Sequence, residues 1–368
     1  MSLADYLDQL TAPGELVEEL DGKRVKCTAC AHNCRIGEGN RGGCKVRYNR
    51  GGTLRVPAGY VSSLQVDPIE KKPFYHFMAG SNALTFGMLG CNFHCGFCQN
   101  WLTSQALRED ESEMLSRHIR EMASDEIVQV GVKNQAKVVA SSYNEPLITS
   151  EWAHEIFSKG KNAGLRPVYV SNGFATPQVL EYMRPVLEGF KVDLKTMQDQ
   201  RYRELGGSLQ PVLDSIQLGF DLGFWIEIVT LVVPGFNDTE SELKEMAGFI
   251  KYISPEIPWH VTAFRPDYKM TDKPRTSAAS LRQAVEIGQQ EGLLYVYGGN
   301  MPGSLGEFEH TRCHQCQELL IRRTGFSVQE YRITADGTCP DCGARIPGVW
   351  TDKPEEINRG RMHYPRII

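Results

Sequence analysis

Between residues 83 and 300, short runs of β-branched and aromatic residues alternate with longer amphipathic segments. Short apolar runs bounded by polar or turn-forming residues are typical of buried strands. They predict seven strands, at Leu84–Leu89, Lys137–Tyr143, Pro167–Ser171, Phe190–Leu194, Trp225–Val233, His260–Phe264 and Leu294–Tyr297.

Helix signals lie between the predicted strands. Thr176-Pro177 offers an N-cap followed by proline at the first helical position. Thr239 and Glu242 fit a capping box, and a later helix is expected from about Ser277 to Gly292. Strand–helix alternation over this length predicts parallel βα units. A complete eightfold barrel takes about 250 residues, so we expect an α/β fold with an open, partial (β/α)6 barrel of the TIM type.

The flanking segments have a different composition. Residues 25–56 are rich in Gly and Cys, and small segments with so few apolar residues usually need a metal to fold. Cysteines return after residue 311. We therefore expect an N-terminal Cys-rich metal-binding segment (1–70), the barrel (71–305), and a C-terminal zinc-ribbon-like domain with a tail (306–368).

Composition narrows the class of protein. With 41% hydrophobic and 23% charged residues, the 368-residue chain resembles an ordinary globular protein. Its net charge of −5 gives no support to a positive electrostatic potential over the whole surface that would attract nucleic acid. The first residues lack the regions of a signal peptide, and no apolar stretch reaches about 18 residues. We expect a cytoplasmic protein with no membrane partner, where clustered cysteines indicate metals rather than disulfides.

The eleven cysteines fall into groups of four, three and four, which leaves none unassigned. A group of four can complete the coordination sphere of a metal, whereas a group of three cannot. The count therefore predicts one catalytic and two structural sites. The groups are Cys27, Cys30, Cys34 and Cys44; Cys91, Cys95 and Cys98; and Cys313, Cys316, Cys339 and Cys342.

The middle group has a spacing that suits an iron–sulfur cluster held by three thiolates. A cubane of four irons normally takes four protein thiolates. With three, one iron keeps an open coordination position, where chemistry can take place. The alternative is a zinc site completed by His94.

The two outer groups differ in regularity. The C-terminal group consists of two CxxC knuckles separated by 22 residues, which predicts structural zinc in a ribbon. The N-terminal group is less symmetrical. It favours zinc, with His32 available as a substitute ligand, and the alternative is an auxiliary iron–sulfur cluster.

The CxxxCxxC spacing, with Phe97 directly before the last cysteine, resembles the signature of radical S-adenosylmethionine (SAM) enzymes. The rest of the chain is similar to the pyruvate formate-lyase activating enzyme-like branch and, more narrowly, to the AmmeMemoRadiSam system radical SAM enzymes. This resemblance covers nearly the whole chain. It implies a [4Fe-4S] cluster whose open iron chelates SAM and, once reduced, cleaves it to methionine and a hydrogen-abstracting 5′-deoxyadenosyl radical.

Polar residues follow the predicted strands, as is usual for reactive groups in barrel enzymes. The resemblance gives several of them a role toward SAM. Phe97 would stack on its adenine. Glu145 stands where relatives carry Gly-Gly-Glu and would bind its ammonium group, and Asn144 would add an amide contact. The alternative is that Asn144-Glu145-Pro146 only forms a turn and a helix start.

Other strand ends carry further candidates. Asn172 lies in a Ser-Asn-Gly segment that resembles one at a strand end of the relatives, and Asn300 lies among glycines that permit close approach. Asp193 and Lys195 share one face of their strand and would lie near the ribose and carboxylate of SAM. His260 would reach toward SAM. The alternative for Asn172 is a simple turn. For Asp193 and Lys195 it is a structural ion pair, and for His260 it is a core histidine.

The sequence therefore predicts a radical SAM oxidoreductase, similar to the activating enzymes, that uses a flavodoxin- or ferredoxin-type reductant. Its substrate class stays open between a substrate protein such as a glycyl radical enzyme, a tRNA and a small molecule. A zinc-binding interaction protein built on an inert barrel is the alternative from a different class.

Overall fold

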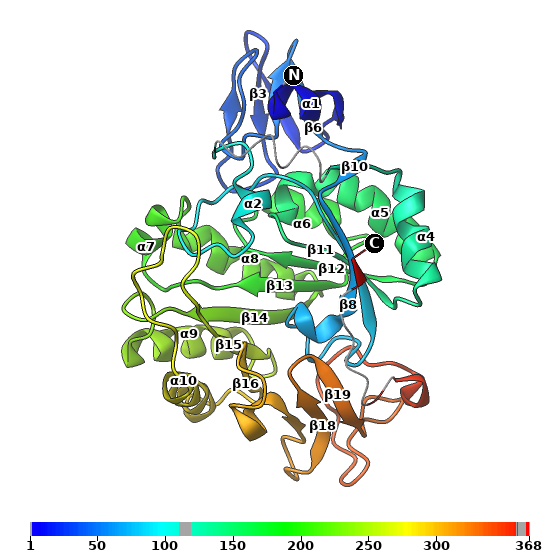
Figure 1. Cartoon of the computed structure of the whole chain (residues 1–368), viewed down its shortest axis with the longest axis vertical. Coiled ribbons are helices and arrows are strands. Elements are labelled where there is room, and N and C mark those ends of the chain that lie inside the picture. The colour runs from blue at the N-terminus through cyan, green and yellow to red at the C-terminus, as the bar shows by residue number, and fades with distance from the viewer. Residues whose placement is uncertain (1, 110–118, 358, 360–365, 368) are drawn as a thin grey trace.

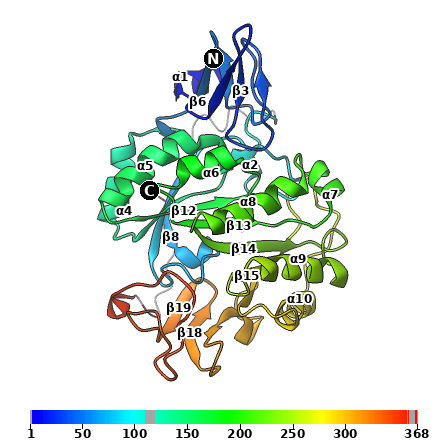
Figure 2. The ribbon, with the colours of Figure 1, turned by 180° about the vertical axis from the view of Figure 1, so that it is seen from behind.

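The computed structural model describes residues 2–109, 119–357, 359 and 366–367. Its centre is a nine-stranded sheet with the strand order β16-β15-β14-β13-β12-β11-β9-β8-β20 (Figures 1 and 2). Seven neighbours in this order pair in parallel. They are β9 (Asn82–Gly87), β11 (Val138–Ser141), β12 (Arg166–Ser171), β13 (Gly189–Asp193), β14 (Trp225–Val232), β15 (Trp259–Ala263) and β16 (Val296–Gly299).

Helices connect each of these strands to the next, so the predicted βα alternation is confirmed. Because β16 and β20 lie at the two ends of the strand order, the sheet is open within the described residues, as expected of a partial barrel. The connecting helices are α4 (Ser124–Lys133), α5 (Ser150–Asn162), α6 (Pro177–Met183), α8 (Leu209–Asp221), α9 (Glu240–Ile253) and α10 (Ala278–Gln290). Shorter helical elements are α2 (Trp101–Ser104), η2 (Pro146–Thr149) and α7 (Asp199–Glu204).

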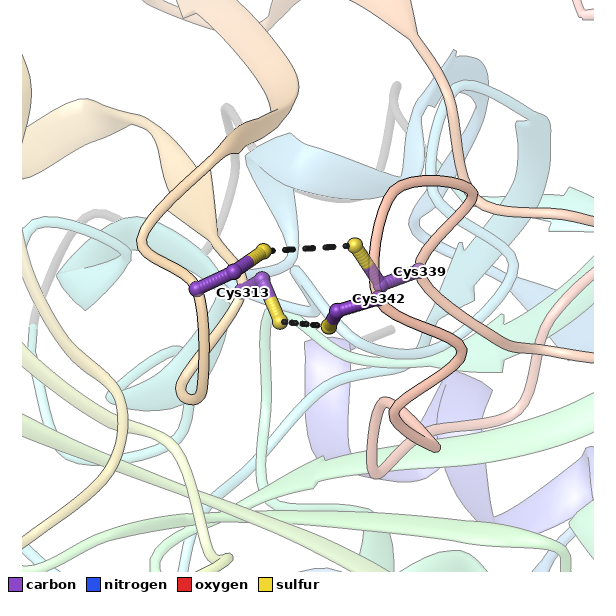
Figure 3. A group of neighbouring side chains, drawn as sticks. Cys313, Cys339 and Cys342 are labelled. Atoms are coloured by element: carbon purple, nitrogen blue, oxygen red, sulfur yellow. Dashed lines mark hydrogen bonds between the residues drawn. The ribbon is translucent and has the colours of Figure 1, made fainter.

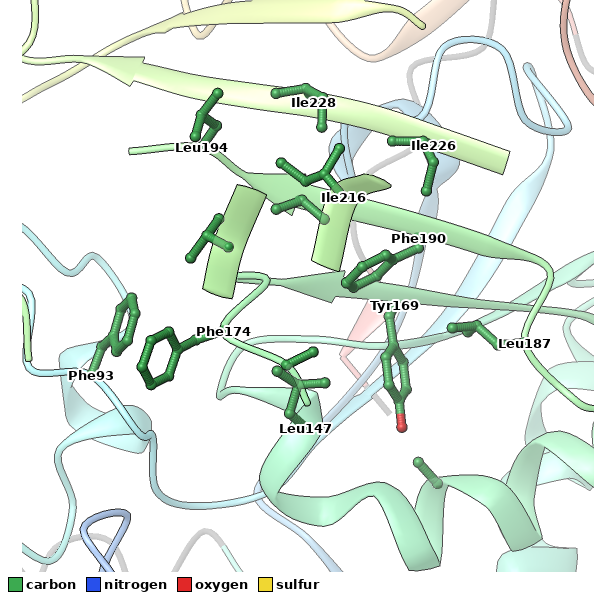
Figure 4. Close-up of a cluster of buried hydrophobic side chains, with 14 of the residues drawn as sticks. Phe93, Leu147, Tyr169, Phe174, Leu187, Phe190, Leu194, Ile216, Ile226 and Ile228 are labelled. Carbon is green, nitrogen blue, oxygen red and sulfur yellow. The ribbon is translucent and has the colours of Figure 1, made fainter. Parts of the chain in front are cut away.

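A continuous apolar layer joins the sheet to its helices (Figure 4). Tyr169, Phe190 and Ile228 are fully buried on their strands. Parallel strands are covered on both faces, which explains their near-continuous apolar sequences. The helices bury one face only: α8 buries Val212 and Ile216, spaced by one helical turn.

Helix α9 begins differently from the prediction. Thr239 caps it, because its Oγ1 accepts a hydrogen bond from the Glu242 backbone N–H at 3.4 Å. The reciprocal half of the capping box is not formed. The Glu242 carboxylate instead accepts hydrogen bonds from Thr196 Oγ1 at 2.5 Å and the Met197 N–H at 3.0 Å. Glu242 therefore ties α9 to the loop that follows β13.

The N-terminal region lies at one end of the long axis (Figures 1 and 2). The antiparallel strand β8 (Ser63–Pro68), inside the predicted segment 1–70, pairs with β9 and extends the barrel sheet. The region contains α1 (Leu3–Gln9) and two three-stranded sheets. One is made of β1 (Thr11–Pro13), β6 (Thr53–Pro57) and β5 (Tyr48–Arg50), the other of β2 (Val17–Leu20), β3 (Arg24–Cys27) and β4 (Arg35–Ile36); β7 (Tyr60–Val61) pairs with β10 (Arg120–Glu121).

The C-terminal region lies at the opposite end of the long axis. Its three-stranded sheet has a small core of its own, in which Leu320 and Val328 cluster with Tyr297 of β16. None of the helices in the described ranges is long and apolar enough to cross a membrane. The remaining elements are η1 (Ile69–Lys71), η3 (Gly306–Glu309), β17 (Thr311–Arg312), β18 (Leu319–Thr324), β19 (Ser327–Tyr331), η4 (Pro354–Glu356) and β20 (Arg366–Ile367).

Candidate active site

The loop after β9 carries the three-cysteine group and packs tightly against the N-terminal region. Gly90, directly before Cys91, has a φ of +93°. A Cβ at this position would lie 2.8 Å from Val46 Cγ1 and 3.2 Å from the carbonyl oxygen of Cys44. Both the backbone conformation and the lack of space therefore require glycine here.

The three sulfurs of this loop share one environment. Burial, followed by the charges of Glu145 and Cys95, raises the pKa of the Cys91 thiol. The Phe93 backbone N–H donates a hydrogen bond to Cys91 Sγ at 3.4 Å. Cys98 Sγ lies 3.3 Å from a hydroxyl of α2, that of Ser104. Two of the three thiols of this loop, those of Cys91 and Cys98, thus have polar partners of their own.

A cavity of about 420 Å³ opens beside this loop at the carboxyl ends of the parallel strands. Phe97 lines it, is 6% exposed and packs edge-on against Phe236, with ring centroids 5.7 Å apart. Residues from most of the strand ends converge on the same space, as in other barrels. The lining comprises Cys95, Phe97, Cys98, Gln99, Asn100, Ser142, Tyr143, Val170, Lys191, Asp193, Lys195, Val229, Leu231, Thr262 and Asn300, together with Lys71, Lys72, Pro73 and Phe326.

An ion-paired group of three side chains lies in this cavity. Asp193 Oδ2 accepts a hydrogen bond from Lys195 Nζ at 3.1 Å, and its other oxygen pairs with Lys191. Burial alone would raise the pKa of Asp193, but the two ammonium groups outweigh it and lower the pKa to about 2. The structure thus brings Asp193 and Lys195 to the cavity, and it adds Lys191, which the sequence analysis did not single out.

Glu145 lies behind the cavity wall. Its carboxylate accepts hydrogen bonds from Ser171 Oγ at 2.6 Å, the Asn172 N–H at 2.8 Å and the Leu147 N–H at 3.1 Å. Burial raises its pKa to about 7. Glu145 caps η2 and joins two strand-end loops. The structure therefore favours the turn and helix-start alternative over a contact with the ammonium of SAM.

The two predicted asparagines also bond to the protein itself. The Asn144 side chain accepts a hydrogen bond from the Met88 N–H at 3.0 Å, and Asn172 Nδ2 donates to Asn92 Oδ1 at 2.8 Å. Met88 and Asn92 flank Cys91 along the chain. In this structure the asparagines thus position the cysteine loop rather than line the cavity.

His260 lies away from the cavity. It is the second residue of β15, near the amino end of the strand, whereas the cavity lies at the carboxyl ends. Its Nε2 is 2.7 Å from Glu227 Oε2, and its ring contacts Tyr75 and Tyr297 at centroid distances of 4.8 and 5.3 Å. The structure therefore favours the core-histidine alternative.

Several cavity residues were missed because they do not follow a parallel strand. Lys71 and Lys72 precede β9, and Phe326 lies between β18 and β19 of the C-terminal region. Lys72 Nζ donates to Asp67 Oδ2 at 2.9 Å and to the Tyr143 hydroxyl at 3.0 Å. Burial lowers the pKa of Lys72 to about 8. The signal that could have found this residue is the charged Glu-Lys-Lys-Pro segment between two strands, shortly after β8.

The C-terminal cysteines form a compact group (Figure 3). Cys313 Sγ lies 3.6 Å from Cys342 Sγ, and Cys316 Sγ lies 3.7 Å from Cys339 Sγ. Four thiolates at about 2.3 Å around one tetrahedral zinc ion are separated by about 3.8 Å. The donor set and its spacing therefore fit a metal site with four cysteine ligands.

A model of the radical SAM superfamily matches residues 86–250. "Uncharacterized protein MJ0808" of Methanocaldococcus jannaschii is 36% identical over 332 residues, which cover 89% of this chain and 97% of that protein. The benzylsuccinate synthase activating enzyme of Thauera aromatica is 26% identical over 137 residues, 35% of this chain and 41% of that enzyme.

Solved structures with a similar fold include a radical SAM methyltransferase from Sphaerobacter thermophilus. It has 13% identity and a TM-score of 0.46, with 84% of this chain and 81% of that chain covered. A domain of a pyruvate-formate lyase-activating enzyme from Bacteroides vulgatus has 20% identity and a TM-score of 0.38, with 45% and 100% covered.

The superfamily model and the Methanocaldococcus relative identify the family, and the cysteine loop lies inside the range that the model matches. By the near full-length match, the chain shares its family with the Methanocaldococcus protein. The family implies a [4Fe-4S] cluster and SAM, and the cavity beside three grouped thiols fits both. The chain belongs to the radical SAM superfamily and is a radical SAM enzyme.

Proposed function

We propose that this enzyme, which resembles the AmmeMemoRadiSam system radical SAM enzymes, acts as an activase that removes a hydrogen atom from a glycine residue of a glycyl radical enzyme. The observation that carries the catalytic part is the cavity in which Cys95 and Cys98 face Asp193 and Lys195. When bound and reduced, the cluster and SAM supply a 5′-deoxyadenosyl radical. The residues of the chain bind, orient and shield these groups.

Cys91, Cys95 and Cys98 would hold the cluster, because the loop offers three thiols and leaves one iron for SAM. SAM carries a carboxylate and an ammonium group on its methionine part. The lysines that pair with Asp193 can exchange that carboxylate for the methionine carboxylate, since both are ionised acceptors. Asp193 then becomes free to accept hydrogen bonds from the ammonium or the ribose.

Phe97 offers the adenine an apolar surface, because its ring is held by Phe236 and lines the cavity. Asn144 and Asn172 do not line the cavity, and their side chains bond to the cysteine loop instead. By bonding beside the first cysteine, they keep the cysteine loop in register with the strand ends. Their role is to position the loop rather than to contact SAM.

The activase role is supported by the partial similarity to the benzylsuccinate synthase activating enzyme. In such a reaction the substrate is a protein segment that must enter the cavity. A low-potential electron is also needed to reduce the cluster, and we propose a flavodoxin- or ferredoxin-type donor as its source. Structural zinc in the C-terminal site is part of the same proposal, on the basis of its four thiolates.

A second candidate is radical modification of an anionic small molecule or of tRNA. It is favoured by the four lysines that line the cavity, Lys71, Lys72, Lys191 and Lys195, which outnumber their two carboxylate partners, Asp67 and Asp193. This excess of positive charge suits a phosphate- or carboxylate-bearing substrate.

The test is anaerobic turnover of reconstituted protein with SAM and dithionite, followed by quantification of 5′-deoxyadenosine. Wild-type protein is expected to form it, and the Cys98→Ala variant is expected to form none above background. Addition of a glycyl radical enzyme should accelerate turnover and give a glycyl radical signal in electron paramagnetic resonance (EPR). Acceleration by tRNA or by a phosphorylated small molecule instead would replace the activase with the second candidate.

A further inference from the structure

The N-terminal cysteines lie on two adjoining segments. Cys27 ends β3, and its backbone N–H donates to the Cys34 carbonyl at 2.9 Å, directly before β4. Cys30 lies in the turn between them. Cys44 joins from the following loop, where the Gly43 N–H donates to Cys34 Sγ at 3.4 Å. The four sulfurs lie near one another, because burial and then the charges of the other three cysteines raise the pKa of the Cys30 thiol.

A backbone N–H group points at one of these sulfurs, as is usual in metal–thiolate sites. It is the Gly43 N–H, which donates to Cys34 Sγ. Hydrogen bonds of this kind stabilise sulfur ligands and tune the potentials of iron–sulfur centres. The segment is therefore built to receive a metal.

A buried cation balances the site. Arg47 is 1% exposed, and its charge interacts with Cys27 and Cys44. Two of its guanidinium nitrogens donate to Glu151 at 2.6 and 2.7 Å, but its Nε has no hydrogen-bond partner among the described residues. A buried, partly unpartnered guanidinium beside four thiols fits a negatively charged metal–thiolate centre.

The spacing of the sulfurs distinguishes a cluster from a single ion. Among the residues that the structure describes, only the C-terminal cysteines bring three or more ligand atoms within 4.8 Å of one another. No three of the N-terminal sulfurs are so close, and neither are those of Cys91, Cys95 and Cys98. In a cubane each thiolate binds a different iron, so the sulfurs lie farther apart than they do around one zinc ion. Like the catalytic group, the N-terminal group therefore lacks the compact sulfur spacing of the C-terminal site.

The N-terminal group also adjoins the catalytic loop. A Cβ added at Gly90 would lie 3.2 Å from the carbonyl oxygen of Cys44, so the two loops pack closely here. His32 Nε2 lies 3.0 Å from the Asn92 carbonyl, so this ring bridges the two loops rather than completing a metal site. Arg108 donates to the carbonyls of Gly43 at 2.5 Å and Phe93 at 2.9 Å.

We propose that Cys27, Cys30, Cys34 and Cys44 bind a second [4Fe-4S] cluster, which adjoins the catalytic cluster across these contacts. Four thiolates complete its coordination, so it binds no SAM. It would accept one electron from the proposed flavodoxin- or ferredoxin-type donor, which is thereby oxidised, and pass that electron to the catalytic cluster, so that it returns to its oxidised state. The catalytic part of this proposal rests on the proposed function, whereas the metal content of the N-terminal group does not.

The test compares iron, sulfide and zinc in anaerobically reconstituted full-length variants. Wild-type protein is expected to hold about eight irons and one zinc. A Cys91→Ala/Cys95→Ala/Cys98→Ala variant leaves the N-terminal group intact and should keep about four irons, with an EPR signal after reduction by dithionite. About two zinc ions and no iron in this variant would overturn the proposal.

A second variant controls for loss of iron through misfolding. Cys30→Ala/Cys34→Ala should lose about four irons and keep its C-terminal zinc. In reduced wild-type protein, each cluster signal should be broadened by its neighbour, and each variant should give one narrow signal. Full iron retention in this variant, or unbroadened wild-type signals, would count against adjoining clusters. Failure of SAM cleavage with eight irons still bound would affect the proposed function alone.

Discussion

Two regions of this molecule carry four cysteines each, at opposite ends of its long axis, yet they have different geometries. The C-terminal sulfurs come from two CxxC knuckles and approach one another to 3.6 and 3.7 Å. The N-terminal sulfurs come from a strand end, a turn and a separate loop, and no three of them are mutually within 4.8 Å. The number of thiols is equal, so it does not decide which metal is bound.

The surroundings differ as well. The N-terminal region contacts the catalytic loop through His32, whose Nε2 lies 3.0 Å from the Asn92 carbonyl, and it buries Arg47 against Glu151 of α5. The C-terminal region has its own small core and reaches the cavity through Phe326. We infer that the first region is part of the redox machinery and that the second is a structural module touching the substrate entrance.

The largest effect is expected from removal of the C-terminal ligands. The Cys339→Ser/Cys342→Ser variant should lose the zinc ion that we propose for this site, and structural zinc contributes on the order of 10 kcal/mol to the folding of small domains. The region should become sensitive to limited proteolysis, while the iron content stays at the wild-type value. Loss of iron together with zinc would break the distinction between the two regions.

The second-largest effect on stability is expected at the salt bridge between Arg47 and Glu151, which holds the N-terminal region against α5. Arg47→Met leaves Glu151 buried without its partner, which costs about 3–5 kcal/mol. Urea unfolding should report this loss, and the matched Arg47→Met/Glu151→Leu variant should recover much of it. Equal stability of the single variant and wild type would contradict the proposed packing.

Glu227 tests whether the His260 network is structural. Its carboxylate accepts hydrogen bonds from the backbone N–H groups of Tyr75 and His76 at 2.9 Å. Glu227→Gln should cost about 1–3 kcal/mol of stability and leave the KM for SAM unchanged. For comparison, the cavity variant Lys195→Met should raise that KM about tenfold, because it removes about one charged hydrogen bond to SAM. A raised KM in Glu227→Gln would restore the predicted SAM contact of His260.

The smallest effect on stability is expected at Phe326, which is 40% exposed. Phe326→Ala should change the free energy of unfolding by less than about 0.5 kcal/mol. Because the ring lines the cavity, the KM for the substrate should rise while SAM cleavage without substrate is unaffected. An unchanged substrate KM would remove the C-terminal region from the entrance.

The sequence was most informative where a residue's function follows from its place along a strand. Buried parallel strands read as apolar runs, so the seven strands and the cavity position of Asp193 and Lys195 could be predicted. His260 shows the limit of this approach. The prediction began its strand at His260 itself, but polar residues near the amino end of a strand face the opposite rim from the cavity.

Other parts of the site depend on tertiary packing and gave no local signal. Lys72 and Phe326 reach the cavity because β8 and the C-terminal region dock there. Glu145 has the residue type expected of an ammonium ligand, but its oxygens are taken by Ser171 and Asn172, from a strand 27 residues later. Sequence spacing likewise left the N-terminal metal open, because the distance between sulfurs depends on how β3, β4 and the next loop meet.

The most direct test of this account is anomalous X-ray diffraction from a crystal of anaerobically purified protein, measured at the iron and zinc absorption edges. The account predicts iron density at Cys91, Cys95 and Cys98 and at the N-terminal cysteines, and zinc density at the C-terminal cysteines alone. Zinc at the N-terminal cysteines would contradict the second cluster. Absence of iron from the loop after β9 would contradict the radical SAM mechanism itself.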